Sequence, residues 1–343
     1  MVLVVMTAVA GVTLSLLAVT ARQLRVTRLR WDMQQAVTLA DAAVVRGLAD
    51  WTPDRVAATP IGVLRDTVQL WPEGWITHQR IMRTGPLMAV VDASAERRRG
   101  TAATTAGDPR DPWTVRRRVA RVVWLQPPAL PLPAAVTVLG GLTLAGAAID
   151  GRDQPASNPE PADDCGAHRD TASRAAVAAR AITGNGERVQ GERQALSPAQ
   201  LGQAWTTLQV AQPLLLTRLR AHRALSGGRL PEAPHWQGQQ LGAPGLVSTL
   251  TGDADIRGLL LIDGDLVITG TLHLDGLLVV RGRLDASEGR LLLHGQLLVA
   301  DPAGHDALLG PGTAVRYNPC LVGRALAAIA QPRPEPFFSW NTP

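Results

Sequence analysis

The sequence contains no lysine, so all 34 basic residues are arginine. It also contains only two phenylalanines and one tyrosine, and side chains that stack on nucleic-acid bases are therefore scarce. An all-arginine basic complement, with abundant Ala, Gly, Pro and Leu, is typical of a GC-rich genome rather than of selection for phosphate contacts. We expect no nucleic-acid partner, despite the net charge of +5.

Cysteine is almost as rare, with Cys165 and Cys320 the two in the chain. Two cysteines are too few for a disulfide framework, but one bridge between them would close a long loop and suit an extracytoplasmic domain. The alternative is a pair of free, buried thiols in a reducing compartment. The membrane anchor described next favours the bridge.

Motifs that carry chemistry are missing too. The histidines show no metal-ligand spacing: His78, His168, His222, His235, His273, His294 and His305. No phosphate-binding glycine loop follows a strand and opens a helix, and no serine lies in a nucleophile elbow. We expect no metal, no cofactor and no small-molecule substrate.

Charge is absent from the first 21 residues, which run from Met1 to Ala21 and are followed by four arginines within nine positions. As a helix this segment is about 31 Å long, which matches the hydrocarbon thickness of a bilayer. It predicts a single membrane span, in preference to a buried core helix or a cleaved signal. Its small residues would permit close packing with other helices in lipid: Ala8, Ala10, Gly11, Ala18 and Ala21.

Helical spacing of apolar residues continues beyond the span, with no proline before Pro53. One helix is therefore expected over 1–52, in the membrane at its start and amphipathic afterwards. This shape resembles the N-terminus of type IV pilins, and more closely the PilX N-terminal domain family of minor pilins. The matching residues are Leu16, Leu17, Thr20, Arg22, Arg28, Asp32 and the run Ala40, Asp41, Ala42, Ala43.

The resemblance implies a minor pilin anchored in the bacterial inner membrane with its large domain outside. Its partners would be other pilin subunits or inner-membrane pilus assembly proteins. Arginines on the C-terminal flank alone would instead keep the body in the cytoplasm. A basic leader upstream of the present start would remove this conflict. A separate departure from the pilin pattern is that Leu16 stands where pilins carry a glutamate.

A pilin-like sheet region is expected over 53–130. Strands over Leu87–Ala93 and Thr114–Leu125 would form an antiparallel hairpin packed on the helix. The arginine runs 97–99 and 116–118 are either anion sites or, more commonly, a solvated edge that discourages strand pairing.

A strand pair, a loop and a helix are expected over 131–240. Glycines punctuate the alternating stretch Ala134–Asp153. Ser197 and Pro198 would cap and begin a helix over Leu196–His222, with a kink at Pro213.

An internal repeat dominates 241–343. Leucine- and valine-rich runs begin at Gly258, Gly276 and Gly295, which lie 18 and 19 residues apart. This period predicts a small β-solenoid, with an antiparallel β-meander as the alternative. The region resembles part of some PilX-type envelope proteins and, more loosely, the bactofilins. The C-terminal tail is expected to cap the last rung.

The fold class is therefore α+β: a long membrane helix, an antiparallel sheet and a small solenoid or meander. Solenoids can carry acid/base carboxylates, but the candidate residues sit next to corner glycines, where aspartate commonly serves turns: Asp263, Asp265, Asp275 and Asp285. We expect a structural protein that is not an enzyme, a pilin-like subunit. The alternatives are a membrane-tethered envelope scaffold outside any pilus and, more weakly, a membrane-anchored carbohydrate-active enzyme.

Overall fold

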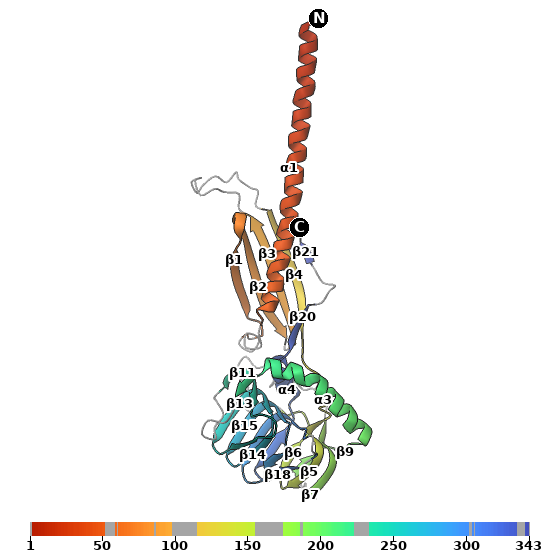
Figure 1. Cartoon of the computed structure of the whole chain (residues 1–343), viewed down its shortest axis with the longest axis vertical. Helices are drawn as coiled ribbons and strands as arrows, with labels where there is room; N and C mark the ends of the chain where they lie inside the picture. The colour runs from red at the N-terminus through yellow and green to blue at the C-terminus, as the bar shows by residue number, and fades with distance from the viewer. Residues whose placement is uncertain are drawn as a thin grey trace.

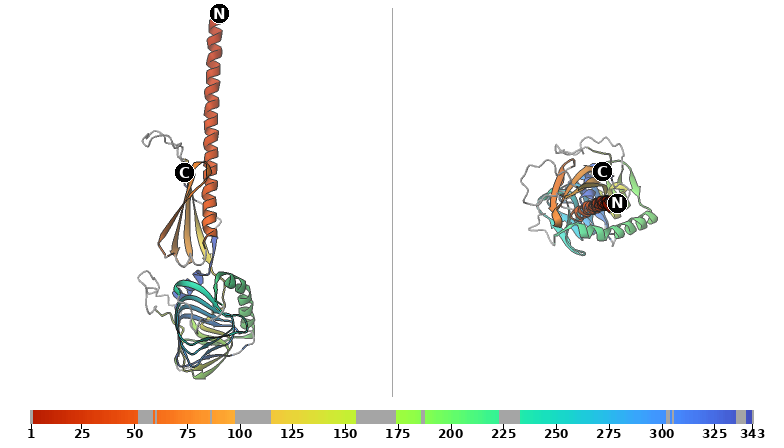
Figure 2. Two further views of the ribbon diagram at one scale, coloured as in Figure 1. Left: turned by 60° about the vertical axis from the view of Figure 1, so that its left-hand side comes forward. Right: turned by 90° about the horizontal axis from the view of Figure 1, so that it is seen from above.

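A computed structural model gives the architecture of the chain (Figure 1). It describes residues 2–51, 59, 61–85, 87–97, 115–154, 174–185, 188–222, 233–301, 304, 306–334 and 340–342. A long N-terminal helix runs into an antiparallel sheet, and a larger body of parallel strands lies beyond that sheet (Figures 1 and 2).

Helix α1 spans Val2–Ala49 without a break, which confirms a single helix extending well past Ala21. Its 48 residues make a rod of about 72 Å. Within the apolar half, Thr13 and Thr20 donate hydrogen bonds to the carbonyls of Val9 and Leu16 on the preceding turn. These bonds satisfy the hydroxyl groups inside the helix, so they do not need water.

An antiparallel sheet covers the C-terminal half of α1. Its strands are β1 Leu64–Leu70, β2 Trp75–Gly85, β3 Met88–Arg97, β4 Val115–Gln126, β20 Gln331–Pro334 and β21 Trp340–Thr342. Ala36, Ala40 and Val44 of the helix are fully buried in one cluster with Val91 and Val123 of the sheet. The expected β3–β4 hairpin on the helix is therefore confirmed.

The C-terminal tail behaves differently from the expectation. Strands β20 and β21 both pair antiparallel with β4, so these parts of the tail complete the first sheet and do not cap a rung. The prediction was wrong because β4 is otherwise an edge strand, with a row of backbone groups that needs a partner. Pro332 and Pro334 suit this position, since proline is tolerated in edge strands.

The second sheet has 15 strands, and all its pairings among described residues are parallel. The strands are β5 Ala134–Ala145, β6 Ala148–Asp150, β7 Ala175–Asn185, β8 Arg188–Gln190, β9 Arg193–Ala195, β10 Arg220–His222, β11 Ala233–Leu241, β12 Val247–Leu250, β13 Asp253–Ile262, β14 Asp265–Ile268, β15 Thr271–Val280, β16 Leu284–Ala286, β17 Arg290–Val299, β18 Ala307–Leu309 and β19 Thr313–Arg316. Parallel pairing excludes the antiparallel meander for the repeat region.

The parallel pairings fall into three rows. The first row joins 220–222, 237–241, 258–262, 276–280, 295–299, 136–138, 177–179 and 193–195. The second row joins β12, β14, β16, β18, 142–144 and 182–184. The third row joins 253–257, 271–275, 290–294, β19, β6 and β8. Each repeat contributes one segment to each row.

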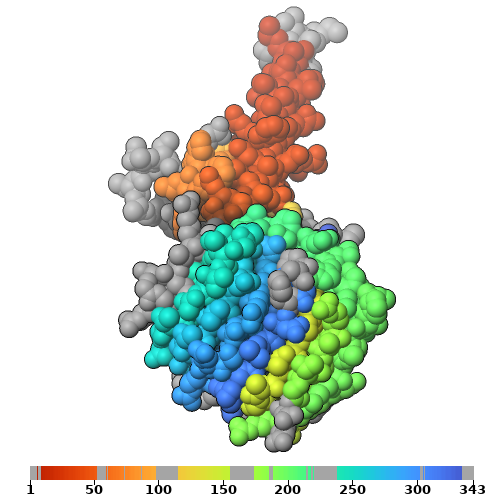
Figure 3. Space-filling model, turned by 60° about the horizontal axis from the view of Figure 1, so that its bottom comes forward, coloured from red at the N-terminus to blue at the C-terminus, as the bar shows by residue number. Residues whose placement is uncertain are grey.

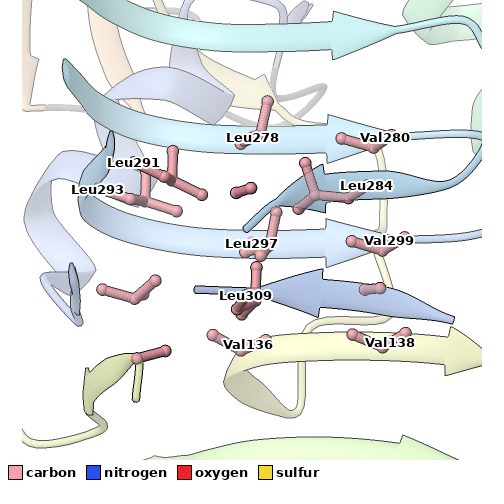
Figure 4. Packing of buried hydrophobic residues seen from close by; sticks show 14 of the residues in the cluster. Val136, Val138, Leu278, Val280, Leu284, Leu291, Leu293, Leu297, Val299 and Leu309 are labelled. Atoms are coloured by element: carbon pink, nitrogen blue, oxygen red, sulfur yellow. The ribbon is translucent and has the colours of Figure 1, made fainter. Parts of the chain in front are cut away.

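The three rows enclose one apolar core, part of which is visible in Figure 4. Each row sends buried side chains into it: Leu260, Leu278 and Leu297; Leu266, Leu284 and Leu309; Ile256, Leu274 and Leu293. In the first and third rows these side chains lie in register on successive strands, which explains the nearly constant spacing of the repeat.

The order of strands in the rows is not the order in the sequence. Strand β5 pairs with β17, so the segment that comes first in the chain stacks after the last repeat. In Figure 3 the blue C-terminal strands lie directly beside the yellow β5 region. The stretches expected as two domains, 131–240 and 241–343, therefore share one sheet and one core.

Helix α3, Pro198–Arg218, returns the chain from one end of the first row to the other. Its 21 residues span about 31 Å, close to the roughly 34 Å covered by seven strand spacings. The predicted cap is confirmed, because Ser197 and Gln200 form a reciprocal capping box. The helix buries its apolar face in a second cluster on the outside of this row.

The short helix α4 spans Pro319–Ala327. It packs on the first row beside α3, so that row is covered on both faces. This explains why the segments of the first row are continuous apolar runs. In the other two rows, buried and more exposed side chains alternate.

Candidate functional site

Most of the exposed large hydrophobic side chains of the described residues lie on α1. Met6, Leu14, Leu17 and Trp31 are each more than three-fifths exposed, and the membrane-span window is not buried against the rest of the molecule. This helix is long and apolar enough to cross a membrane. Figures 1 and 2 show it projecting well beyond both sheets.

The small residues expected to pack in the membrane lie on this exposed segment. Ala10, Gly11, Ala18 and Ala21 are all exposed and fall within an arc of about 100° around the helix axis. The backbone of Ala8 is helical, and its side chain is outside the described part. A Cβ added at Gly11 would meet nothing within 4 Å, so this glycine has no packing role inside the subunit.

Ion pairs attach the C-terminal half of α1 to the sheet. Asp32 accepts a hydrogen bond from Arg97 at 3.0 Å, and Asp41 pairs with Arg121. Arg97 also lies over the ring of Trp75, with its guanidinium carbon 5.6 Å from the ring centroid. The two acidic residues that carry the pilin resemblance thus fix the rotation of the helix on its sheet.

The arginine runs are used unequally. Arg97 is bound to the helix, and Arg118 donates to Asp92 of β3 at 2.6 Å, which raises the pKa of Arg118. Arg98 and Arg99 lie outside the described residues. The runs therefore include structural partners of the helix and sheet, which neither the anion-site nor the solvated-edge interpretation anticipated.

The two bodies meet at the end of α4. Ile329 is buried in the cluster under α3, and the next residue, Ala330, is buried in the cluster between α1 and its sheet. Arg83 of β2 is buried nearby and donates to the carbonyl of Thr59 at 3.2 Å. Burial, with repulsion from Arg324 of α4 as a second cause, lowers the pKa of Arg83 to about 10.

One of the two cysteines is within the described residues. Cys320, at the start of α4, is disulfide-bonded. Cys165 is the other cysteine of the sequence and lies outside the described residues.

Three of the four candidate aspartates form hydrogen bonds or ion pairs with neighbouring parts of the parallel body. Asp263 pairs with Arg281 at 2.6 Å, Asp265 accepts from the backbone N–H of Arg283 at 2.8 Å, and Asp285 accepts from the Ser287 hydroxyl at 2.6 Å. Each bond links a rung to the next or closes a corner, so these carboxylates have structural partners.

The fourth aspartate, Asp275, belongs to a cluster that the sequence interpretation missed. Its side chain lies with those of His273 and His294, and one ligand atom from each residue falls within 4.8 Å of the others. His78 pairs with Glu96 at 3.7 Å, whereas His168 and His305 lie outside the described residues and the side chains of His222 and His235 are not described. The signal was the repeat itself, because His294 follows Asp275 by one 19-residue period.

No family model, no curated protein and no solved structure matches this chain.

Proposed function

We propose that the chain is a pilin-like structural subunit anchored in the bacterial inner membrane by α1, and that it is not an enzyme. The observation that carries the proposal is the single uninterrupted helix, with one half docked on a sheet of its own chain and the other half left as an exposed apolar rod. This division of one helix suits a subunit that is held in lipid and then packed into a filament core.

The free energy gained by covering the exposed half of α1 supports a membrane location. Eight of its large apolar side chains are more than half exposed: Met6, Val9, Val12, Leu14, Leu16, Leu17, Val19 and Leu24. At about 1.5–3 kcal/mol for each side chain, covering them is worth roughly 12–24 kcal/mol. That is comparable to or larger than the net stability of a typical domain, about 5–15 kcal/mol, which favours covering this surface with lipid or other helices.

The parallel body would be the displayed head. We interpret its three rows as the faces of a β-solenoid, in which β5–β9 supply the last coils and α3 closes the circuit. A disulfide at Cys320 supports an oxidising compartment, and hence an extracytoplasmic head with a Cys165–Cys320 bridge. The partners would then be other pilin subunits or inner-membrane assembly proteins, bound through the small residues of α1.

A cross-linking experiment tests the assembly. Leu17→Cys places a thiol on the exposed half of α1, and Ala40→Cys places one on the half that is buried by the sheet. In oxidised membranes we expect covalent dimers with the first variant and none with the second. Equal cross-linking of the two variants, or of neither, would contradict packing through the exposed half.

Topology is tested in the same cells by alkylating free thiols before lysis and sequencing the mature N-terminus. Oxidised cysteines on an externally accessible body support the proposal. Reduced cysteines that react only after lysis would place the body in the cytoplasm and overturn it.

A membrane-tethered scaffold outside any pilus is the second candidate. Among the described strands, β9 and β10 lie at opposite ends of the first row, and each pairs with one neighbour. Open parallel edges can add the edge of another copy. Polymers that persist after deletion of α1 would favour the scaffold over the pilin-like subunit.

A further inference from the structure

The His273, Asp275 and His294 cluster lies on the third row. His273 and Asp275 are two residues apart on β15, so they project from the same face of the strand. His294 lies directly opposite Asp275 on β17 in the parallel register. Two adjacent strands therefore present three ligand-type side chains as a triangle on the outer surface.

We propose that these three residues form a binding site for a divalent transition metal of the zinc type. The inference stands apart from the proposed membrane role, because it rests on the parallel body alone. The chemistry is two imidazoles and one carboxylate, a set that suits zinc, copper or nickel better than magnesium or calcium, which prefer oxygen ligands.

The distances fit this chemistry. Ligands placed about 2.0–2.1 Å from a tetrahedral zinc ion are about 3.3 Å from one another. Here Oδ1 of Asp275 lies 3.0 Å from Nδ1 of His294 and 3.7 Å from Nε2 of His273. All three ligand atoms lie within 4.8 Å of one another, so binding would require side-chain rotations that close the wider gaps.

A neighbouring carboxylate is placed to orient one ligand. Oδ1 of Asp255 on β13 lies 3.7 Å from Nδ1 of His273, the nitrogen on the opposite side of the ring from Asp275. A carboxylate that accepts from the second ring nitrogen fixes the tautomer of a metal-bound histidine and increases its basicity. At 3.7 Å the contact is an ion-pair distance and not a hydrogen bond, so the Asp255 carboxylate would have to move closer to Nδ1 to leave Nε2 of His273 as the metal ligand.

The cluster is partly buried, and its surroundings hold positive as well as negative charge. The side chains of Asp275 and His294 are 17% and 14% exposed, whereas His273 is 36% exposed, so the site opens to solvent on the His273 side. Two arginines lie in register with the cluster, Arg257 on β13 and Arg316 on β19. Arg316 also contributes to the lowered pKa of Asp150, which places its charge close to that carboxylate.

Three protein ligands leave a fourth position for water or for a ligand from another molecule. A metal there would bind β15 to β17 through side chains, in addition to their backbone ladder. The competing interpretation is a histidine–aspartate hydrogen bond with His273 beside it, and the two make different predictions for metal affinity.

The test is a Zn²⁺ titration of the full chain, purified in detergent without a polyhistidine tag. Calorimetry should give one equivalent per chain, and Co²⁺ at the same site should give the visible absorption of tetrahedral coordination. His273→Ala should weaken binding by more than about 100-fold, since loss of even an outer-shell partner typically costs 10–100-fold. His294→Gln tests the second ligand with little change in side-chain volume.

His78→Ala is the matched control, because His78 also pairs with a carboxylate but is not in the cluster. It should leave the affinity unchanged, and circular dichroism should show all variants folded. Failure of the wild-type chain to bind Zn²⁺ in the micromolar range would overturn the site. Equal affinity of wild type, His273→Ala and His294→Gln would overturn it as well.

Discussion

Replacing Gly295 by alanine should destabilise the parallel body strongly. Gly258, Gly276 and Gly295 pair in register where the third row turns into the first, and all three have positive φ, 145° at Gly295. A Cβ at Gly295 would lie 1.7 Å from the carbonyl oxygen of Gly276, a backbone atom that cannot rotate away. The substitution therefore combines an unfavourable conformation with a clash between two rungs.

The magnitude follows from these two effects. A non-glycine residue in a sparsely populated region costs about 1–3 kcal/mol, and overpacking of a rigid site costs about 1–3 kcal/mol more. A total of about 4 kcal/mol should lower Tm by roughly 8–16 °C for a unit of this size. The assay is thermal unfolding of the full chain in detergent, followed by circular dichroism.

Gly202→Ala provides the matched control. Gly202 lies inside α3, and an added Cβ there would meet nothing within 4 Å. The same chemical change should now stabilise the helix by about 1 kcal/mol, which raises Tm by roughly 2–4 °C. Shifts of equal size and sign in the two variants would refute the role assigned to the aligned glycines Gly258, Gly276 and Gly295.

Three other changes test the two cores and one carboxylate. Leu278→Ala removes a fully buried side chain of the parallel body and should lower the free energy of unfolding by about 2–5 kcal/mol, measured in urea. Ala40→Leu should destabilise the helix–sheet unit by about 1–3 kcal/mol, whereas Ala18→Leu on the exposed half should not, and equal effects would contradict the docking. Hydrogen bonds from Arg152 lower the pKa of Asp150, so this group stabilises the fold above its ordinary pKa near 4 and loses that contribution as pH falls below it. Asp150→Asn should therefore reduce stability at pH 7 and flatten the decline of stability as pH falls below about 4, and an unchanged decline would contradict this role.

The sequence could predict the elements whose signals are local. The uncharged run and the following apolar spacing predicted α1, Ser197 predicted the start of α3, and alternation in 114–125 predicted β4. These features depend on side chains within a few turns or residues of one another, so they survive in a single sequence.

Strand direction and partner choice depended on contacts that the chain makes at long range. The repeat indicated stacked glycines, but parallel pairing was settled only when Gly258, Gly276 and Gly295 aligned. Insertion of β5 beside β17 follows from α3, whose length carries the chain back across the sheet, and no local pattern signals that. The His273, Asp275 and His294 cluster was missed for the same reason, since its side chains come together from two strands.

The way in which the two bodies are joined has a mechanical consequence. The chain passes between them twice, from β4 into β5 and from α4 into β20, and the strands on the sheet side of these crossings, β4 and β20, pair with each other. Ile329 and Ala330 anchor the second crossing in both hydrophobic clusters. Two adjacent connections restrict rotation between the bodies more than one connection would. A force applied to the body is therefore transmitted to β4, and through the Arg121–Asp41 ion pair to α1, which is what a subunit anchored by that helix requires.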